Sequence, residues 1–210
     1  MTTTDLIPEN PVQSAIEAIQ HMSDLMESQK LDLLLMKLAC KGATAIRLRK
    51  DQAAKNTEIK TQLEALGFFC DWHAENPHIN QNYIELNITN NPDDLAFLMS
   101  NDFTNNARWG KLSGYPETAI AAFHSEDESQ MIPWGEEPKE VRDAECFELL
   151  HFRLSKNNWR EEMKVAEKWY HALQKSAPAF LEAYLAEKKA YRVWYEAELI
   201  RQQAASQLQA

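Results

Sequence analysis

The residues best suited to bind or transform a ligand gather in a corner between two expected helices, at residues 108–123. This segment reads Arg-Trp-Gly-Lys-Leu-Ser-Gly-Tyr-Pro-Glu-Thr-Ala-Ile-Ala-Ala-Phe and holds two of only five glycines in the chain. Gly110 and Gly114 allow close backbone approach or a positive φ, and the proline after Tyr115 favours an extended residue before a helix. The first amides of that helix then point outward, which is the geometry that binds a carboxylate or a phosphate.

Charged side chains around this corner favour an anion site, and one of them opposes it. Arg108 and Lys111 lie within the corner, and His124 follows its last helix. An acidic small molecule would be held there, with His124 or a loop carboxylate moving protons. Glu117 lies in the first turn of the same helix and would repel an anion, so a purely structural helix–turn–helix corner is the alternative. The candidate ligand-binding residues are Arg108, Lys111, Gly114, Tyr115 and His124.

The same corner resembles a segment of an uncharacterised prokaryotic family, known mostly from archaea, with the form Gly-Lys/Arg-Leu-x-Gly-Tyr/Phe-Pro-x-Cys-Cys. The matching residues are Gly110, Lys111, Leu112, Gly114, Tyr115 and Pro116. Thr118 and Ala119 stand where the family has its paired cysteines, which argues against a thiol or metal role here. The resemblance spans residues 110–123, about 14 of 210, and implies no activity because none is assigned to that family.

Two other groups of residues have ligand chemistry but unsuitable surroundings. Cys70, His73 and His78 are residue types that bind zinc, yet Cys70 and His73 would project from opposite faces of one strand. The acids after His124, at residues 126–128, are typical of a solvated loop. We therefore predict no metal site. The three cysteines are odd in number and widely spaced, which indicates reduced thiols rather than disulfides.

Composition argues against several classes of protein. Residues 101–150 carry 11 acidic and 4 basic side chains, whereas nucleic-acid binding needs a clustered basic face. No apolar run approaches the roughly 18 residues of a membrane span, and the first residues lack a signal-peptide pattern. We expect a soluble cytoplasmic protein without nucleic-acid or membrane partners. No local catalytic or cofactor motif is present, so the sequence specifies neither an activity nor a cofactor.

Hydrophobic periodicity places the corner between a small sheet and a helical tail. Helices are expected from Asn10-Pro11 to about Ser28, Leu31 to Cys40, Asp51 to Leu66, and from Asn91 through Met99. Strands are expected at Ala43–Arg49, Phe68–Trp72 and Tyr83–Ile88. Cys146–Leu154 alternates like a fourth strand, with a helix as the alternative. His151, in that segment, is expected to be an ordinary hydrogen-bonded histidine.

This order of strand, helix, two strands, helices and strand is the split βαβ order of a ferredoxin-like sandwich. The expected fold class is α+β: a small, mainly antiparallel sheet flanked by helices, with a C-terminal antiparallel helical hairpin. Residues 1–155 would form the α+β domain with its N-terminal helices. Residues 156–210 would form the hairpin, packed on that domain as one compact unit.

The hairpin is unusually aromatic. Its aromatic residues include Trp159, Trp169, Tyr170, Phe180, Tyr184, Tyr191, Trp194 and Tyr195. One seam can pack the two helices together, and the remaining aromatics either cover the sheet or form an interface, where such residues are enriched. We expect a homo-oligomer, preferably a homodimer, built through these helices. The preferred hypothesis is a non-catalytic binding or interaction module, and the alternative is an enzyme acting on an acidic small molecule near Gly110–Pro116.

Overall fold

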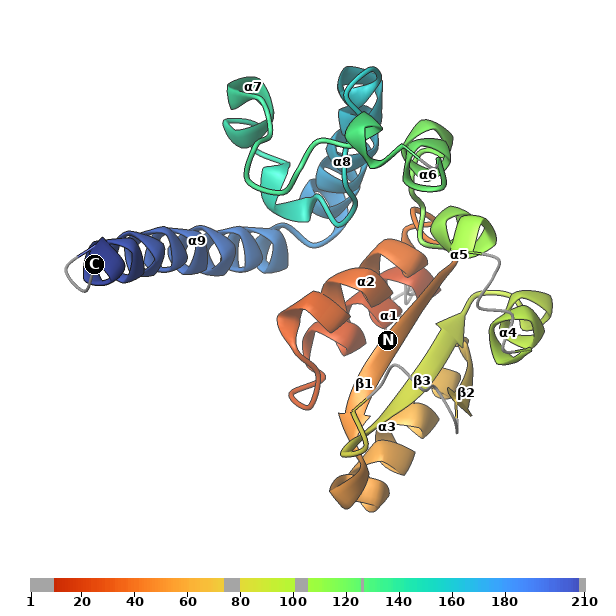
Figure 1. Ribbon diagram of the computed structural model, residues 1–210. Helices are drawn as coiled ribbons and strands as arrows, with labels where there is room; N and C mark the ends of the chain where they lie inside the picture. The colour runs from red at the N-terminus through yellow and green to blue at the C-terminus, as the bar shows by residue number, and fades with distance from the viewer. Residues whose placement is uncertain (1–9, 74–79, 101–105, 126, 208–210) are drawn as a thin grey trace, which may run out of the picture.

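Helices surround a small three-stranded sheet in the computed structural model of the chain (Figure 1). The structure describes residues 10–73, 80–100, 106–125 and 127–207. The first half contains α1 (Pro11–Gln20), α2 (Glu27–Lys37), β1 (Ala43–Arg49), η1 (Lys50–Gln52), α3 (Ala53–Ala65), β2 (Phe69–His73), β3 (Tyr83–Thr89) and α4 (Pro92–Met99). The second half contains α5 (Asn106–Leu112), α6 (Glu117–Phe123), η2 (Glu128–Gln130), α7 (Lys139–Arg142), η3 (Phe147–Leu149), α8 (Trp159–Ser176) and α9 (Pro178–Gln207).

The amino-terminal region forms two helices, as expected, but the first ends earlier and the second begins earlier than predicted. α1 begins at the predicted asparagine–proline start but ends at Gln20, so the prediction of a helix to Ser28 is wrong. Leu25 is buried in the turn between the helices. The side chain of Gln29 then accepts a hydrogen bond from the backbone N–H of Met26 at 2.9 Å, which caps the new helix at its first turn. Local capping thus overrides the continuous apolar periodicity.

β3 lies at the centre of the sheet, and both neighbours run antiparallel to it in the order β1-β3-β2. Ile46, Leu86 and Ile88 belong to the buried core beneath α2 and α3. The opposite face is polar, and Asn87 lies there against α4, with its Nδ2 3.6 Å from Met99 Sδ. All three predicted strands are confirmed within one residue at either end.

The strand predicted at Cys146–Leu154 is wrong. This segment contains the short helix η3 and continues without regular secondary structure, with a bend at Phe152. In the described residues it adds no fourth strand to the sheet, and its neighbourhood contributes one isolated bridge, Met131–Ser155. Leu149 and Leu150 are both buried although they are consecutive. The segment therefore does not bury a single alternating face, as a strand of the sheet would. The fold is α+β, and its sheet has the first three strands of the ferredoxin-like order.

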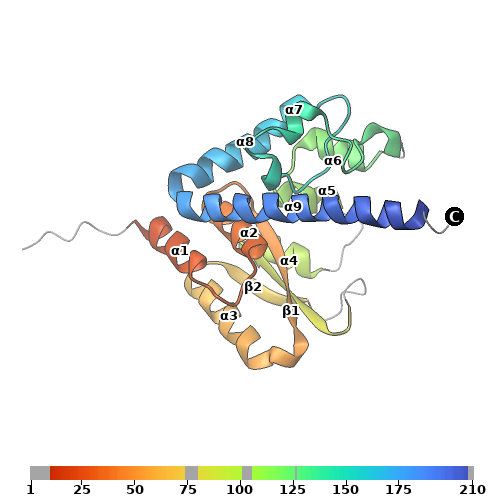
Figure 2. The same cartoon turned by 90° about the vertical axis from the view of Figure 1, so that its left-hand side faces the viewer.

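The helical second half packs at one end of the sheet. α5 lies against the start of β1, where the backbone N–H of Gly42 donates to the carbonyl oxygen of Leu112 at 2.7 Å. α8 packs on α2, and α6, α7 and α8 lie above the sheet in Figure 1. α8 and α9 meet at Ala177 and contact each other. α9 has 30 residues against 18 in α8, and its second half projects from the body (Figures 1 and 2).

Candidate functional site

A pocket of about 400 Å³ lies between the α5–α6 corner and the chain around residues 131–134 and 151–153. Much of its wall is aromatic, from Trp109, Tyr115, Phe123, Trp134 and Phe152. Its basic side chains are His124, His151 and Arg153. Among the described residues, no carboxylate lines the pocket. It therefore combines an apolar, aromatic interior with cationic or hydrogen-bonding groups, which is the composition of a small-molecule site.

One wall of the pocket is the corner singled out in the sequence. A Cβ on Gly110 would lie only 2.9 Å from Ile120 Cγ1, so the absence of a side chain lets α5 and α6 pack closely. The backbone N–H of Tyr115 donates to the carbonyl oxygen of Gly110 at 3.0 Å and closes the turn between the two helices. The corner is a helix–turn–helix element, and it also forms part of a cavity.

The other wall is made of two segments that pair as a short antiparallel ladder. The N–H of Ile132 donates to the oxygen of Leu154, and the N–H of Lys156 donates to the oxygen of Gln130, both at 2.8 Å. These bonds hold the segment with Met131 and Trp134 beside the segment with Phe152 and Arg153. Burial does alternate at the end of this segment, where Leu150, Phe152 and Leu154 are buried and His151 and Arg153 are half-buried, although these residues join no sheet.

Two of the five predicted ligand-binding residues, Tyr115 and His124, line this pocket. The ring of Tyr115 packs against Phe152, with centroids 5.3 Å apart. Burial, with a smaller effect from the negative charge of Asp32, raises the pKa of Tyr115 to about 12. The phenol is therefore neutral at physiological pH and brings no charge to the pocket, and its hydroxyl already contacts the side chain of Ser113.

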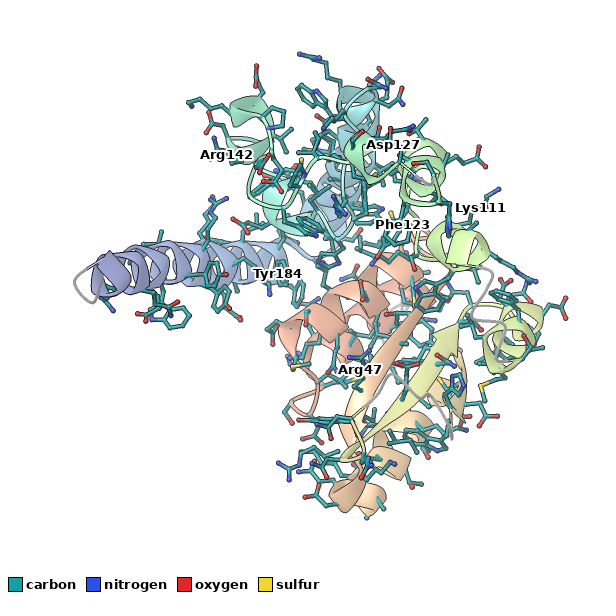
Figure 3. The ribbon with its side chains drawn as sticks, in the orientation of Figure 1. Arg47, Lys111, Phe123, Asp127, Arg142 and Tyr184 are labelled. Atoms are coloured by element: carbon teal, nitrogen blue, oxygen red, sulfur yellow. The ribbon has the colours of Figure 1, made fainter. Side chains whose placement is uncertain are left out.

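The two predicted cations lie elsewhere. Arg108 pairs with Asp94 at 3.2 Å, and its guanidinium carbon stands 4.1 Å from the ring centroid of Phe97. Lys111 extends outward from α5 and pairs with Glu117 at 3.1 Å (Figure 3). Neither lines the pocket. The corner predicted from the sequence thus borders the pocket, whereas its two predicted cations lie outside the pocket lining.

Gly114, the remaining predicted residue, positions the corner and does not line the cavity. Its φ of 77° lies in the left-handed region, and a Cβ there would come within 2.4 Å of the carbonyl oxygen of Cys40. The same Cβ would lie 3.4 Å from the ring of Trp169 on α8. Gly114 is thus the point where the corner is pressed against both the α2–β1 connection and α8.

Arg153 is the pocket cation that the sequence reading missed. Its Nε donates to the carbonyl oxygen of Ile132 at 3.4 Å, which ties the guanidinium to the pocket wall. The sequence does contain a pattern that points to this residue. His151 and Arg153 are the basic residues of the segment 146–154, and they alternate with the apolar residues Leu150, Phe152 and Leu154. Placing them on one face would have predicted a basic surface opposite the core.

His151 also connects the pocket to a buried polar cluster, which consists of Asp32, Lys41, Thr44, His151 and Tyr184. Asp32, on α2, pairs with Lys41, accepts a hydrogen bond from Thr44 Oγ1 at 3.0 Å and lies 3.6 Å from His151 Nδ1. The other ring nitrogen of His151 lies 3.4 Å from the hydroxyl of Tyr184, at the start of α9 (Figure 3). His151 thus links α2, the pocket wall and α9.

No family model, curated protein or solved structure matches the chain. The resemblance of residues 110–123 to an archaeal family stays a prediction. At the two positions where that family has cysteines, Thr118 donates a hydrogen bond to the buried carboxylate of Glu162 at 2.7 Å, and Ala119 lines the pocket. These two positions are therefore structurally important in this chain without any thiol.

The charge balance of the polar cluster favours an ionised Asp32. Burial is the largest single influence and raises the pKa of Asp32, but the contact with His151 and the charge of Lys41 together outweigh it. The pKa of Asp32 is consequently held well below its ordinary value of 3.8. Since both ring nitrogens of His151 already face protein groups, the cluster fixes the pocket wall and leaves ligand contacts to Arg153, His124 and Tyr115.

The residue types that could bind zinc, Cys70, His73 and His78, are not brought together in the part of the chain that the structure describes. Cys70 pairs across the sheet with Ile88 and His73 pairs with Glu85, so the two project from opposite faces of β2, while His78 lies outside the described residues. In the described ranges, no group of three or more metal-binding side chains is arranged to hold an ion. None of the helices in those ranges has the length and apolarity to cross a membrane. A cytoplasmic location stays a prediction.

Proposed function

We propose that the protein is a binding module for a small organic acid whose aromatic or apolar body occupies the pocket. The observation that supports this most strongly is the position of Arg153. Its guanidinium is hydrogen-bonded to the backbone of the pocket wall, in a cavity lined mainly by aromatic side chains. The bond from its Nε to Ile132 leaves the two terminal amino groups of the guanidinium available. No carboxylate of the described chain lies within ion-pair distance of Arg153. A guanidinium in that state is suited to bind a ligand carboxylate through two parallel hydrogen bonds.

The size and lining of the pocket narrow the ligand class further. A volume of about 400 Å³ lies near the lower end of the ~300–1,000 Å³ typical of small-molecule sites. Aromatic walls favour a planar ring, which can stack or pack edge to face against them. We therefore infer a ligand with one ring and one acidic group, held with its acid at Arg153 and its ring among Trp109, Phe123 and Trp134.

The test compares an acid with its neutral isostere. We expect indole-3-acetate to bind more tightly than indole-3-acetamide, and Arg153→Met to weaken binding of the acid by about 10–100-fold, since a charge-assisted hydrogen bond contributes roughly 1.5–3 kcal/mol. Binding of the amide should change by less than about threefold. Isothermal titration calorimetry at pH 7.5 measures both ligands on both proteins.

Arg160→Met is the matched control, because Arg160 stacks over Trp159 at 4.1 Å and does not line the pocket. It should bind the acid like the wild type. Equal affinity for acid and amide in the wild type, or undiminished binding of the acid by Arg153→Met, would contradict the proposal. Native mass spectrometry of the protein as purified would identify a retained natural ligand.

The catalytic alternative has one specific observation in its favour. His124 lines the same pocket as Tyr115, which supports a role for this histidine in exchanging a proton with a bound acid. In that case His124→Gln would abolish turnover of the natural ligand while leaving its dissociation constant within about threefold of the wild-type value. A similar loss of binding in His124→Gln would assign His124 to ligand binding alone.

A further inference from the structure

The apolar seam of the long helix α9 is buried near the start of the helix and exposed further along it. Near its start, Phe180, Leu181 and Tyr184 are buried against the rest of the chain. Tyr191 and Tyr195 follow Tyr184 by seven and eleven residues, which places them on the same stripe of the helix. The seam is thus continuous along α9, and its rings beyond Tyr184 are exposed, although Arg192 beside them still pairs with Glu148 of η3 at 3.1 Å.

Three aromatic rings cluster on this exposed part of α9. Tyr191, Trp194 and Tyr195 are 60%, 55% and 49% exposed. The ring of Tyr191 stacks on Tyr195 at 6.2 Å and leans on Trp194 at 5.7 Å, so the rings form one patch. Exposed aromatic patches of this kind, flanked by charged residues, mark protein interaction sites.

The charges along α9 indicate what covers the patch. Glu187 and Arg201 lie seven residues before and seven residues after Trp194, so all three share one stripe at heptad spacing. Both charged side chains are exposed, and Arg201 also pairs with Glu198 on its own helix at 3.2 Å. If a second α9 lies antiparallel with its two-fold axis at Trp194, Glu187 of each copy meets Arg201 of the other. This stripe is complementary to itself only in that orientation.

We propose that the patch on α9 binds a second copy of this chain, forming an antiparallel pair of helices centred on Trp194. The two tryptophans pack together at the axis, with Tyr191 and Tyr195 around them and two Glu187–Arg201 pairs at the ends. The exposed parts of six aromatic rings cover less than the ~1,200 Å² of a standard stable interface, so the dimer is expected to dissociate in the micromolar range.

Sedimentation velocity of the full chain from about 1 to 200 μM tests the proposal. The expected result is a reversible shift from the monomer mass to twice that mass. Trp194→Ala should raise the dissociation constant at least tenfold, because it removes the central contact from both copies. Glu187→Arg should raise it about threefold to tenfold, because it places like charges opposite each other at both ends.

The double variant Glu187→Arg, Arg201→Glu distinguishes an antiparallel pair from other arrangements. It restores opposite charges across the two-fold axis, so its dissociation constant should return to within about threefold of wild type. Glu182→Arg is the control, since Glu182 is exposed, undergoes the same change of charge and lies on a different face of α9. A monomer at every concentration, association unaffected by Trp194→Ala, or a double variant weaker than Glu187→Arg would each overturn the proposal.

Discussion

We expect Gly114→Ala to lower the free energy of unfolding by about 2–5 kcal/mol. A left-handed backbone conformation costs an alanine roughly 1–2 kcal/mol, and forced overpacking costs about 1–3 kcal/mol more. Both effects apply here, since φ is 77° and the added Cβ would stand 2.4 Å from the oxygen of Cys40. That oxygen belongs to the backbone, so a side-chain rotation cannot relieve the clash. Urea denaturation followed by circular dichroism measures the change.

Gly135→Ala separates the two contributions. Gly135 has a φ of 87°, but nothing lies within 4 Å of the position that an added Cβ would take, so only the conformational cost applies. We expect a loss of about 1–2 kcal/mol at Gly135 and a clearly larger one at Gly114. Equal losses at the two positions would show that the contact between the corner and the α2–β1 connection does not hold the corner in place.

Features of the fold that depend only on neighbouring residues could be predicted from the sequence. Gly114 and the Tyr115-Pro116 step were identified correctly as a specified corner, because turn chemistry depends on neighbouring residues. The three strands were also predicted, since Ile84, Leu86 and Ile88 alternate without interruption. These patterns need no knowledge of what lies across the fold.

The features that were not predicted depend on distant partners. Arg108 and Lys111 were the nearest cations in sequence, but they pair with Asp94 and Glu117 on the outside of the molecule. The cation that reaches the pocket, Arg153, comes from a segment 30 residues beyond the end of α6 and is brought there by backbone pairing with residues 130–132. No local pattern encodes that pairing.

His151 illustrates the same limit. Its apolar surroundings correctly predicted a hydrogen-bonded residue, and it does contact Asp32 and Tyr184. Those partners lie on α2 and α9, at opposite ends of the chain, so the sequence could not show that the histidine joins them. The pocket wall, the first helices and the projecting helix therefore depend on one buried polar cluster.

The second large effect is expected at that cluster, where Asp32→Asn should lower the free energy of unfolding by about 2–4 kcal/mol at pH 7. The substitution keeps the shape of the side chain but removes its charge, and it leaves the buried ammonium of Lys41 without its partner. Removing one member of a buried ion pair typically costs about 3–5 kcal/mol. The lower range allows for the partial exposure of Asp32, whose side chain is 23% accessible.

The pH dependence has a definite sign. Because the pKa of Asp32 is lower in the folded protein than its ordinary 3.8, the unfolded chain takes up the proton first as the solution is acidified. Its contribution is therefore fully present above about pH 5 and is lost progressively as the pH falls through and below 3.8. Urea titrations between pH 7 and pH 3 should show a steeper loss of stability in the wild type than in Asp32→Asn.

Adding Lys41→Met to Asp32→Asn tests the cause. If the cost arises from an uncompensated buried charge, removing the ammonium should recover about 2 kcal/mol, since an apolar side chain of similar length replaces it in contact with Trp169. Glu64→Gln, which breaks the exposed pair with Lys60, should cost less than about 1 kcal/mol. A double variant no more stable than Asp32→Asn would instead assign the loss to the bonds with Thr44 and His151. Those bonds hold the pocket wall, so that outcome would also predict weaker ligand binding in both variants.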